Sequence, residues 1–130
     1  MKKDSTGKIK VIIVDDSASV RKVFMEVLGA DPEIEVIAAA SDPILAMGHM
    51  TKQWPDVIIT DIAMPRKDGI TFVKEIMASR PTPVIICSGL TEENARISIE
   101  AMAAGAGEII SKPKFGFRDF LQDSTQSLID

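Results

Sequence analysis

Short apolar runs alternate with stretches of helical periodicity along this chain, and the alternation restricts its fold more than any other feature. The runs are four to six residues long, as strands usually are, and occupy residues 9–14, 35–39, 57–60, 84–87 and 108–111. Between them, apolar residues recur at steps of three and four, which is typical of a buried helix face. This alternation predicts a parallel sheet with helices on both faces. We therefore expect an α/β protein with a doubly wound, five-stranded, flavodoxin-like sheet in the order 2-1-3-4-5.

Capping residues mark where the predicted helices begin and end. Ser17 is placed to cap a helix that stops near Gly29, and Asp42 followed by Pro43 predicts the start of a second helix. The third helix is expected to bury one apolar face, made of Ile70, Val73, Ile76 and Met77. A last helix is expected to carry apolar residues at helical spacing between residues 117 and 128.

Composition restricts the class of protein. A chain of 130 residues with 45% hydrophobic residues has the size of one domain that folds without metals or disulfides. The net charge of −4 disfavours nucleic-acid binding, which needs a concentrated basic surface. No apolar stretch reaches the roughly 18 residues of a membrane helix. The one cysteine excludes an internal disulfide and is expected in the core. We expect a flexible segment over residues 1–8, one domain over 9–130, a cytoplasmic location, and neither nucleic-acid nor membrane partners.

Polar side chains follow four of the five predicted strands, at the point where each strand ends. Asp15 and Asp16 follow the first strand, Asp61 the third, Ser88 the fourth and Lys112 the fifth. The carboxyl ends of parallel strands meet at one edge of the sheet, where such sheets bind their ligands. We therefore expect these five side chains to converge.

The three aspartates of this edge predict a site for a divalent cation. Carboxylates crowded together cannot all stay ionised without a compensating positive charge. An oxygen-only ligand set suits Mg²⁺, and Mn²⁺ accepts similar ligands. Acidic residues also follow strands as ordinary helix caps, an interpretation that weakens once Asp61 and Lys112 join the cluster.

Asp61 is the best candidate for a nucleophile. A carboxylate that attacks phosphorus forms an aspartyl phosphate, and the protein then contributes mainly positioning and charge neutralisation. Lys112 and the cation would neutralise the phosphoryl oxygens, and Ser88 would donate a hydrogen bond to one of them. The alternatives are that Lys112 is an exposed surface lysine and that Ser88 is a simple turn residue.

A set of motifs surrounds these residues, namely residues 11–17, Thr60-Asp61, Met64-Pro65, Asp68-Gly69, Ser88 and Lys112-Pro113. Together they resemble the receiver domain of bacterial two-component response regulators, over about residues 8–114. The resemblance implies a switch that a histidine kinase phosphorylates on Asp61 and that also loses its own phosphoryl group. It further implies a Mg²⁺ site made of Asp15, Asp16, Asp61 and the backbone carbonyl of Ala63.

Four further segments, residues 31–36, 40–43, 80–84 and 88–93, are similar to the receivers of chemotaxis methylesterases. In that family the receiver precedes a catalytic domain that hydrolyses glutamyl methyl esters, and this domain is the second partner that the resemblance implies. The chain has no room for it, so we expect an excised receiver that is not itself an esterase. A stand-alone response regulator that acts through protein contacts is the alternative.

Two positions depart from the receiver pattern. Ala63 stands where most such receivers carry a larger polar residue, which should leave the phosphoryl group more open to water. Ile109 stands at the position of an aromatic switch residue, so coupling is expected to run through Ser88 and residues 89–93.

Two other classes of function remain open at this point. A phosphatase or phosphotransferase that uses an aspartyl phosphate would carry its nucleophile on the first strand, with a second aspartate two residues later. Here Ser17 occupies that place relative to Asp15. A degenerate interaction module with the same fold would bind no Mg²⁺ and form no acyl phosphate.

Overall fold

Strands and helices alternate along the chain in the computed structural model, which describes residues 7–61, 69–89 and 92–112. The elements are β1 (Ile9–Val14), α1 (Ala18–Gly29), β2 (Ile34–Ala40), α2 (Pro43–Met50), β3 (Val57–Thr60), α3 (Gly69–Ser79), β4 (Val84–Gly89), α4 (Glu92–Ala103) and β5 (Glu108–Lys112). The helix predicted between residues 117 and 128 lies outside the described residues, as do Ala63 and most of the segment 1–8.

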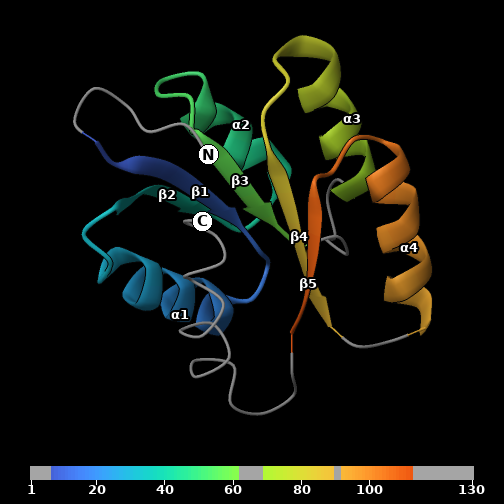
Figure 1. Ribbon diagram of the computed structural model, residues 1–130, viewed down its shortest axis with the longest axis horizontal. Coiled ribbons are helices and arrows are strands. Elements are labelled where there is room, and N and C mark those ends of the chain that lie inside the picture. The colour runs from blue at the N-terminus through green and yellow to red at the C-terminus, as the bar shows by residue number, and fades with distance from the viewer. Residues whose placement is uncertain (1–6, 62–68, 90–91, 113–130) are drawn as a thin grey trace.

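The five strands form one parallel sheet in the order β2-β1-β3-β4-β5, which confirms the predicted fold (Figure 1). Val14, the last residue of β1, pairs with Ala40 of β2 on one side and with Thr60 of β3 on the other. The three strands therefore end at the same level. The chain winds outward in both directions from β1, and this reversal makes the carboxyl edge beside β1 a place for a ligand.

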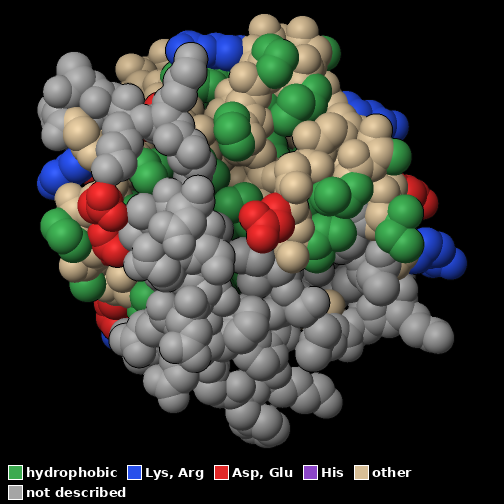
Figure 2. Space-filling model, viewed as in Figure 1, with side chains coloured by type: hydrophobic (Ala, Val, Ile, Leu, Met, Phe, Trp, Pro, Cys, Tyr) green, Lys and Arg blue, Asp and Glu red, His purple; other side chains and the backbone are tan. Residues whose placement is uncertain are grey.

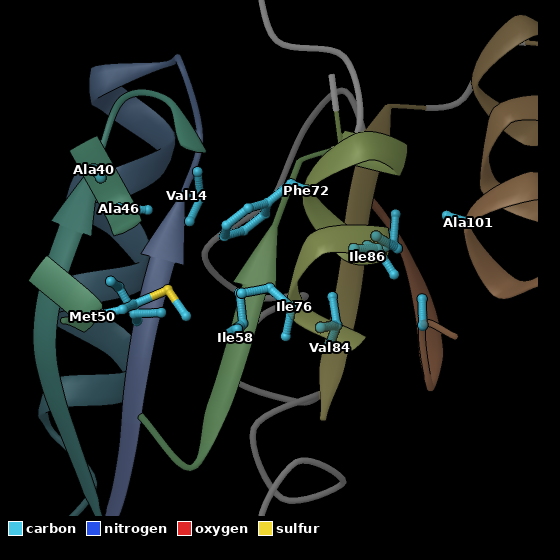
Figure 3. Close-up of a cluster of buried hydrophobic side chains, with 13 residues drawn as sticks. Val14, Ala40, Ala46, Met50, Ile58, Phe72, Ile76, Val84, Ile86 and Ala101 are labelled. Atoms are coloured by element: carbon cyan, nitrogen blue, oxygen red, sulfur yellow. The ribbon is translucent and has the colours of Figure 1, made fainter. Parts of the chain in front are cut away.

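Helices cover both faces of this sheet. Helix α1 packs on one face through Phe24, Val27 and Leu28, which belong to a cluster of buried residues with β1 and β3. Helices α2, α3 and α4 cover the opposite face (Figure 1). Figure 3 shows that second cluster, in which the labelled helix residues are Ala46, Met50, Phe72, Ile76 and Ala101. Burial of these apolar side chains provides most of the driving force for folding.

Local sequence explains the helix starts near the carboxyl edge. Ser17 Oγ accepts a hydrogen bond from the backbone N–H of Val20 at 3.3 Å, and Asp42 Oδ1 accepts one from Leu45 at 2.9 Å. Both predicted caps are therefore present, with Pro43 at the start of α2. Helix α1 ends at Gly29, as predicted, and Ala30 occupies its carboxyl cap.

Strand β4 extends beyond the predicted apolar run. The backbone of Ser88 pairs with Ser111, and Gly89 pairs with Lys112. The strand continues because β5 supplies backbone partners, even though polar and small residues have replaced the apolar pattern. Among the helices of the described ranges, none has the length and apolarity to cross a bilayer.

Candidate functional site

Asp15 is held by hydrogen bonds at the end of β1. Its backbone N–H donates to the carbonyl of Ala40 at 3.0 Å, which continues the ladder between β1 and β2. Its carboxylate oxygen Oδ1 accepts from the backbone N–H of Ser17 at 2.9 Å. The side chain is only 1% exposed, whereas that of the next residue, Asp16, is exposed. The first carboxylate is therefore fixed within the fold, and the second faces solvent beside it.

Asp61 follows β3 at the same level of the sheet. Its backbone N–H donates to the carbonyl of Val14 at 2.8 Å, and its own carbonyl accepts from the buried hydroxyl of Thr60 at 2.8 Å. Asp61 is 9% exposed. These bonds extend the pairing of β1 with β3 by one residue and direct Asp61 toward the end of β1.

The three aspartates meet at this edge, as the sequence predicted. One carboxylate oxygen each from Asp15, Asp16 and Asp61 lies within 4.8 Å of the others. Carboxylates this close repel one another strongly unless a cation lies between them. The donor set fits Mg²⁺ or Mn²⁺, because both prefer oxygen ligands and Mg²⁺ needs only one or two carboxylates beside water and phosphate oxygens. We call these three residues the acidic pocket.

The backbone places Ser88 and Lys112 on the same edge. Thr60 of β3 pairs with Ile86 of β4, so Ser88 lies two positions farther along β4, one position beyond the level of Asp61. Lys112 is the last residue of β5 and pairs with Gly89. The side chains of Ser88 and Lys112 lie outside the described part of the structure, so their roles stay predictions.

One residue near the acidic pocket was missed in the sequence. Nη1 of Arg21, in the first turns of α1, donates to the backbone carbonyl of Asp15 at 2.7 Å. The only indication of this contact in the sequence is a cationic residue one helical turn after the acidic pair. That indication is weak, because lysines and arginines are common on exposed helix faces.

Comparisons with known proteins agree with this geometry. The family model for the response regulator receiver domain matches residues 11–122. The chain belongs to this family. Among solved structures, it is similar to the response regulator domain of Thermotoga maritima CheB, with 39% identity and a TM-score of 0.80 over 94% of this chain and 91% of that one. The receiver is therefore of the methylesterase type, as the finer resemblance predicted.

Two curated relatives carry the name protein-glutamate methylesterase/protein-glutamine glutaminase 2. The protein from Pseudomonas syringae pv. tomato is 56% identical over 94% of this chain. That from Albidiferax ferrireducens is 59% identical over 91% of the chain. In both cases the match covers 34% of the relative. The chain thus spans about a third of the length of these relatives.

Proposed function

We propose that this receiver accepts a phosphoryl group on Asp61 from a phosphohistidine of a histidine kinase. The observation that carries the proposal is the convergence of Asp15, Asp16 and Asp61 within 4.8 Å at the carboxyl edge of the sheet. Membership of the receiver family supports the same assignment. A cluster of carboxylates is costly for a fold, so its presence favours a role in binding a cation.

In the proposed reaction, a carboxylate oxygen of Asp61 attacks the phosphorus of the donor. The new O–P bond forms as the N–P bond to the imidazole breaks, and the imidazole nitrogen leaves with the electron pair of that bond. The backbone bonds of Asp61 to Val14 and Thr60 hold the nucleophile in place during the attack. Ser88 would donate a hydrogen bond to a phosphoryl oxygen, and Lys112 would neutralise another.

Asp15, Asp16, Asp61 and the backbone carbonyl of Ala63 would hold a Mg²⁺ or Mn²⁺ ion, which, when bound, supplies positive charge for the phosphoryl oxygens. Asp15 is suited to an anchoring role because it is buried and fixed by Ser17. Asp16 is exposed, so it can adjust to the ion and its waters.

We further infer that the phosphorylated receiver regulates an attached methylesterase domain through the surface formed by α4 and β5. Three large apolar side chains are exposed there, with Ile99 at 70%, Met102 at 41% and Ile109 at 36%. Figure 2 shows hydrophobic side chains on the surface over α4. Ser88 and the residues after it connect the carboxyl edge to α4, so movement of Ser88 toward the phosphoryl group would shift this surface.

The test of phosphorylation uses a small donor. The protein is incubated with Mg²⁺ and acetyl phosphate, and its intact mass is recorded for the parent, the Asp61→Asn variant and a control variant Glu35→Gln on the exposed edge of β2. We expect one alkali-labile phosphoryl adduct on the parent and on the control, and none on Asp61→Asn. An adduct of equal yield on Asp61→Asn would show that another residue is the acceptor.

A further inference from the structure

The turn between β1 and α1 carries two of the three aspartates of the acidic pocket, and neither neighbouring element fixes its backbone completely. Strand β1 ends at Val14 and α1 begins at Ala18, with Ser17 as its cap. The carbonyl of Asp15 therefore lies between the last paired residue of the strand and the first residue of the helix. The backbone pairing of β1 and the backbone of α1 therefore do not bind this carbonyl, and a side chain of α1 does so instead.

Arg21 supplies that contact. Its guanidinium Nη1 donates to the Asp15 carbonyl at 2.7 Å, reaching back from the helix over its own amino-terminal turn. A hydrogen bond from a charged donor is stronger than one between neutral groups. Together with the N–H of Asp15 on Ala40 and the carboxylate on the N–H of Ser17, it holds Asp15 at three separate groups.

The bond also restricts Asp16. The carbonyl of Asp15 and the N–H of Asp16 belong to one planar peptide unit. The direction of that carbonyl therefore fixes the orientation of the peptide plane that precedes Cα of Asp16. Asp16 is exposed and is not enclosed by the core. The orientation of its peptide therefore helps to direct its carboxylate toward Asp15 and Asp61, with which it clusters.

From this geometry, and resting on the proposed cation site, we propose that Arg21 is a positioning residue of the acidic pocket. By holding the Asp15 carbonyl, it fixes the turn in the shape in which Asp15 and Asp16 both reach a divalent cation. Among the described residues, its guanidinium binds this carbonyl and forms no ion pair with a carboxylate. Arg21 therefore contacts the pocket through a backbone group and not through one of its carboxylates.

The direction in which metal affinity changes when Arg21 is replaced separates this positioning role from a simple effect of its charge. A positive charge near the pocket repels a divalent cation, so removal of the charge alone should strengthen metal binding. Removal of the hydrogen bond should weaken it, because the turn loses its fixed shape. Partners that orient metal ligands in this way typically change affinity by about 10–100-fold.

The experiment measures Mn²⁺ binding directly, from the loss of the free-ion signal in electron paramagnetic resonance, with no phosphodonor present. The variants are Arg21→Met, which keeps an unbranched apolar stem but removes the donor and the charge, and Arg21→Lys, which keeps a charged donor. The matched control is Lys22→Met, which removes an exposed charge from the neighbouring position of α1. Thermal unfolding without metal shows that each variant is folded.

We expect Arg21→Met to bind Mn²⁺ about tenfold or more weakly than the parent. Arg21→Lys should recover part of the loss, and Lys22→Met should bind as tightly as the parent or more tightly. The proposal is overturned if Arg21→Met equals or exceeds the parent, if Lys22→Met weakens as much, or if Arg21→Lys recovers nothing. Should Arg21→Met fail to fold, Arg21→Lys must still bind more weakly than Lys22→Met. A parent that binds no Mn²⁺ would instead refute the proposed function.

Discussion

The crowding of the acidic pocket predicts that the protein without metal becomes more stable when one carboxylate is neutralised. The Asp16→Asn variant is the best test, because Asp16 is exposed and its replacement leaves the buried bonds of Asp15 and Asp61 intact. The carboxylate oxygens of Asp16 and Asp61 lie within 4.8 Å. At that separation Coulomb's law gives about 1 kcal/mol of repulsion in a water-like dielectric and about 3.5 kcal/mol at an effective dielectric constant of 20.

Two effects reduce the gain below the larger of these values. Because Asp16 is exposed whereas Asp61 is buried, the effective dielectric constant lies between these two limits, and a value of about 40 gives about 1.7 kcal/mol of repulsion. The variant also loses a carboxylate near the amino-terminal end of α1, which is worth about 0.3–1 kcal/mol. Repulsion between the adjacent Asp15 and Asp16 persists in the unfolded chain, so it contributes little to the difference. We therefore expect a net stabilisation of about 1 kcal/mol, or a rise in Tm of about 4 °C for a domain of this size.

The assay is thermal unfolding at low ionic strength in EDTA, with Glu35→Gln as a control for loss of an exposed acid away from the pocket. Asp16→Asn should unfold at a higher temperature than both other proteins, and the difference should shrink in high salt. Addition of Mg²⁺ should stabilise the parent and the control more than the variant, since a bound ion stabilises the folded state. If Asp16→Asn unfolds at or below the parent's temperature in EDTA, the repulsion argument is wrong.

Three further predictions concern the scaffold, each checked by urea unfolding. Phe72→Ala removes a side chain that is 0% exposed in the cluster under α3, so it should lower the free energy of unfolding by about 3–5 kcal/mol. A loss no larger than that of a surface substitution would contradict the packing described for Phe72. Gly105→Ala should lower the free energy of unfolding by about 1–2 kcal/mol, because Gly105 has a φ of +122° and the added Cβ would lie 2.7 Å from Cγ of Met77. An unchanged free energy of unfolding would refute this prediction. Thr82→Val removes the hydroxyl that accepts a hydrogen bond from the Trp54 indole N–H at 2.7 Å, so it should lower the free energy of unfolding by about 1–3 kcal/mol. It should also change the fluorescence emission of the only tryptophan, whereas unchanged emission would show that the bond is not maintained.

The strand order and the convergence of the aspartates could be predicted from the sequence, because both depend only on the periodicity of apolar residues and on sheet topology. Apolar runs of strand length mark β1 to β5 within one or two residues. Once the strands are parallel, a residue that follows a strand must lie at the carboxyl edge, whatever the details of packing. Cys87 is buried, as its place within an apolar run indicated.

Contacts that depend on side-chain conformation could not be predicted. Phe72 is fully buried in α3, although the predicted face of that helix did not include it. The buried face of α3 is wider than the stripe predicted from the sequence, because the Phe72 ring points toward Val14 of β1 within the same buried cluster (Figure 3). The indole N–H of Trp54 donates to Thr82, which precedes β4, and the Arg80 guanidinium lies over the Trp54 ring. Such contacts join residues far apart in the chain, and no local sequence pattern predicts them.

The most direct measurement of the central claim is the position of the acyl phosphate itself. Borohydride reduces an aspartyl phosphate to homoserine, which tandem mass spectrometry locates in the digested protein. After treatment with Mg²⁺ and acetyl phosphate, we predict homoserine at residue 61, and its loss when the metal is chelated beforehand. Homoserine at residue 15 or 16, or none at residue 61 in the folded protein, would contradict the assignment of Asp61 as the phosphoryl acceptor.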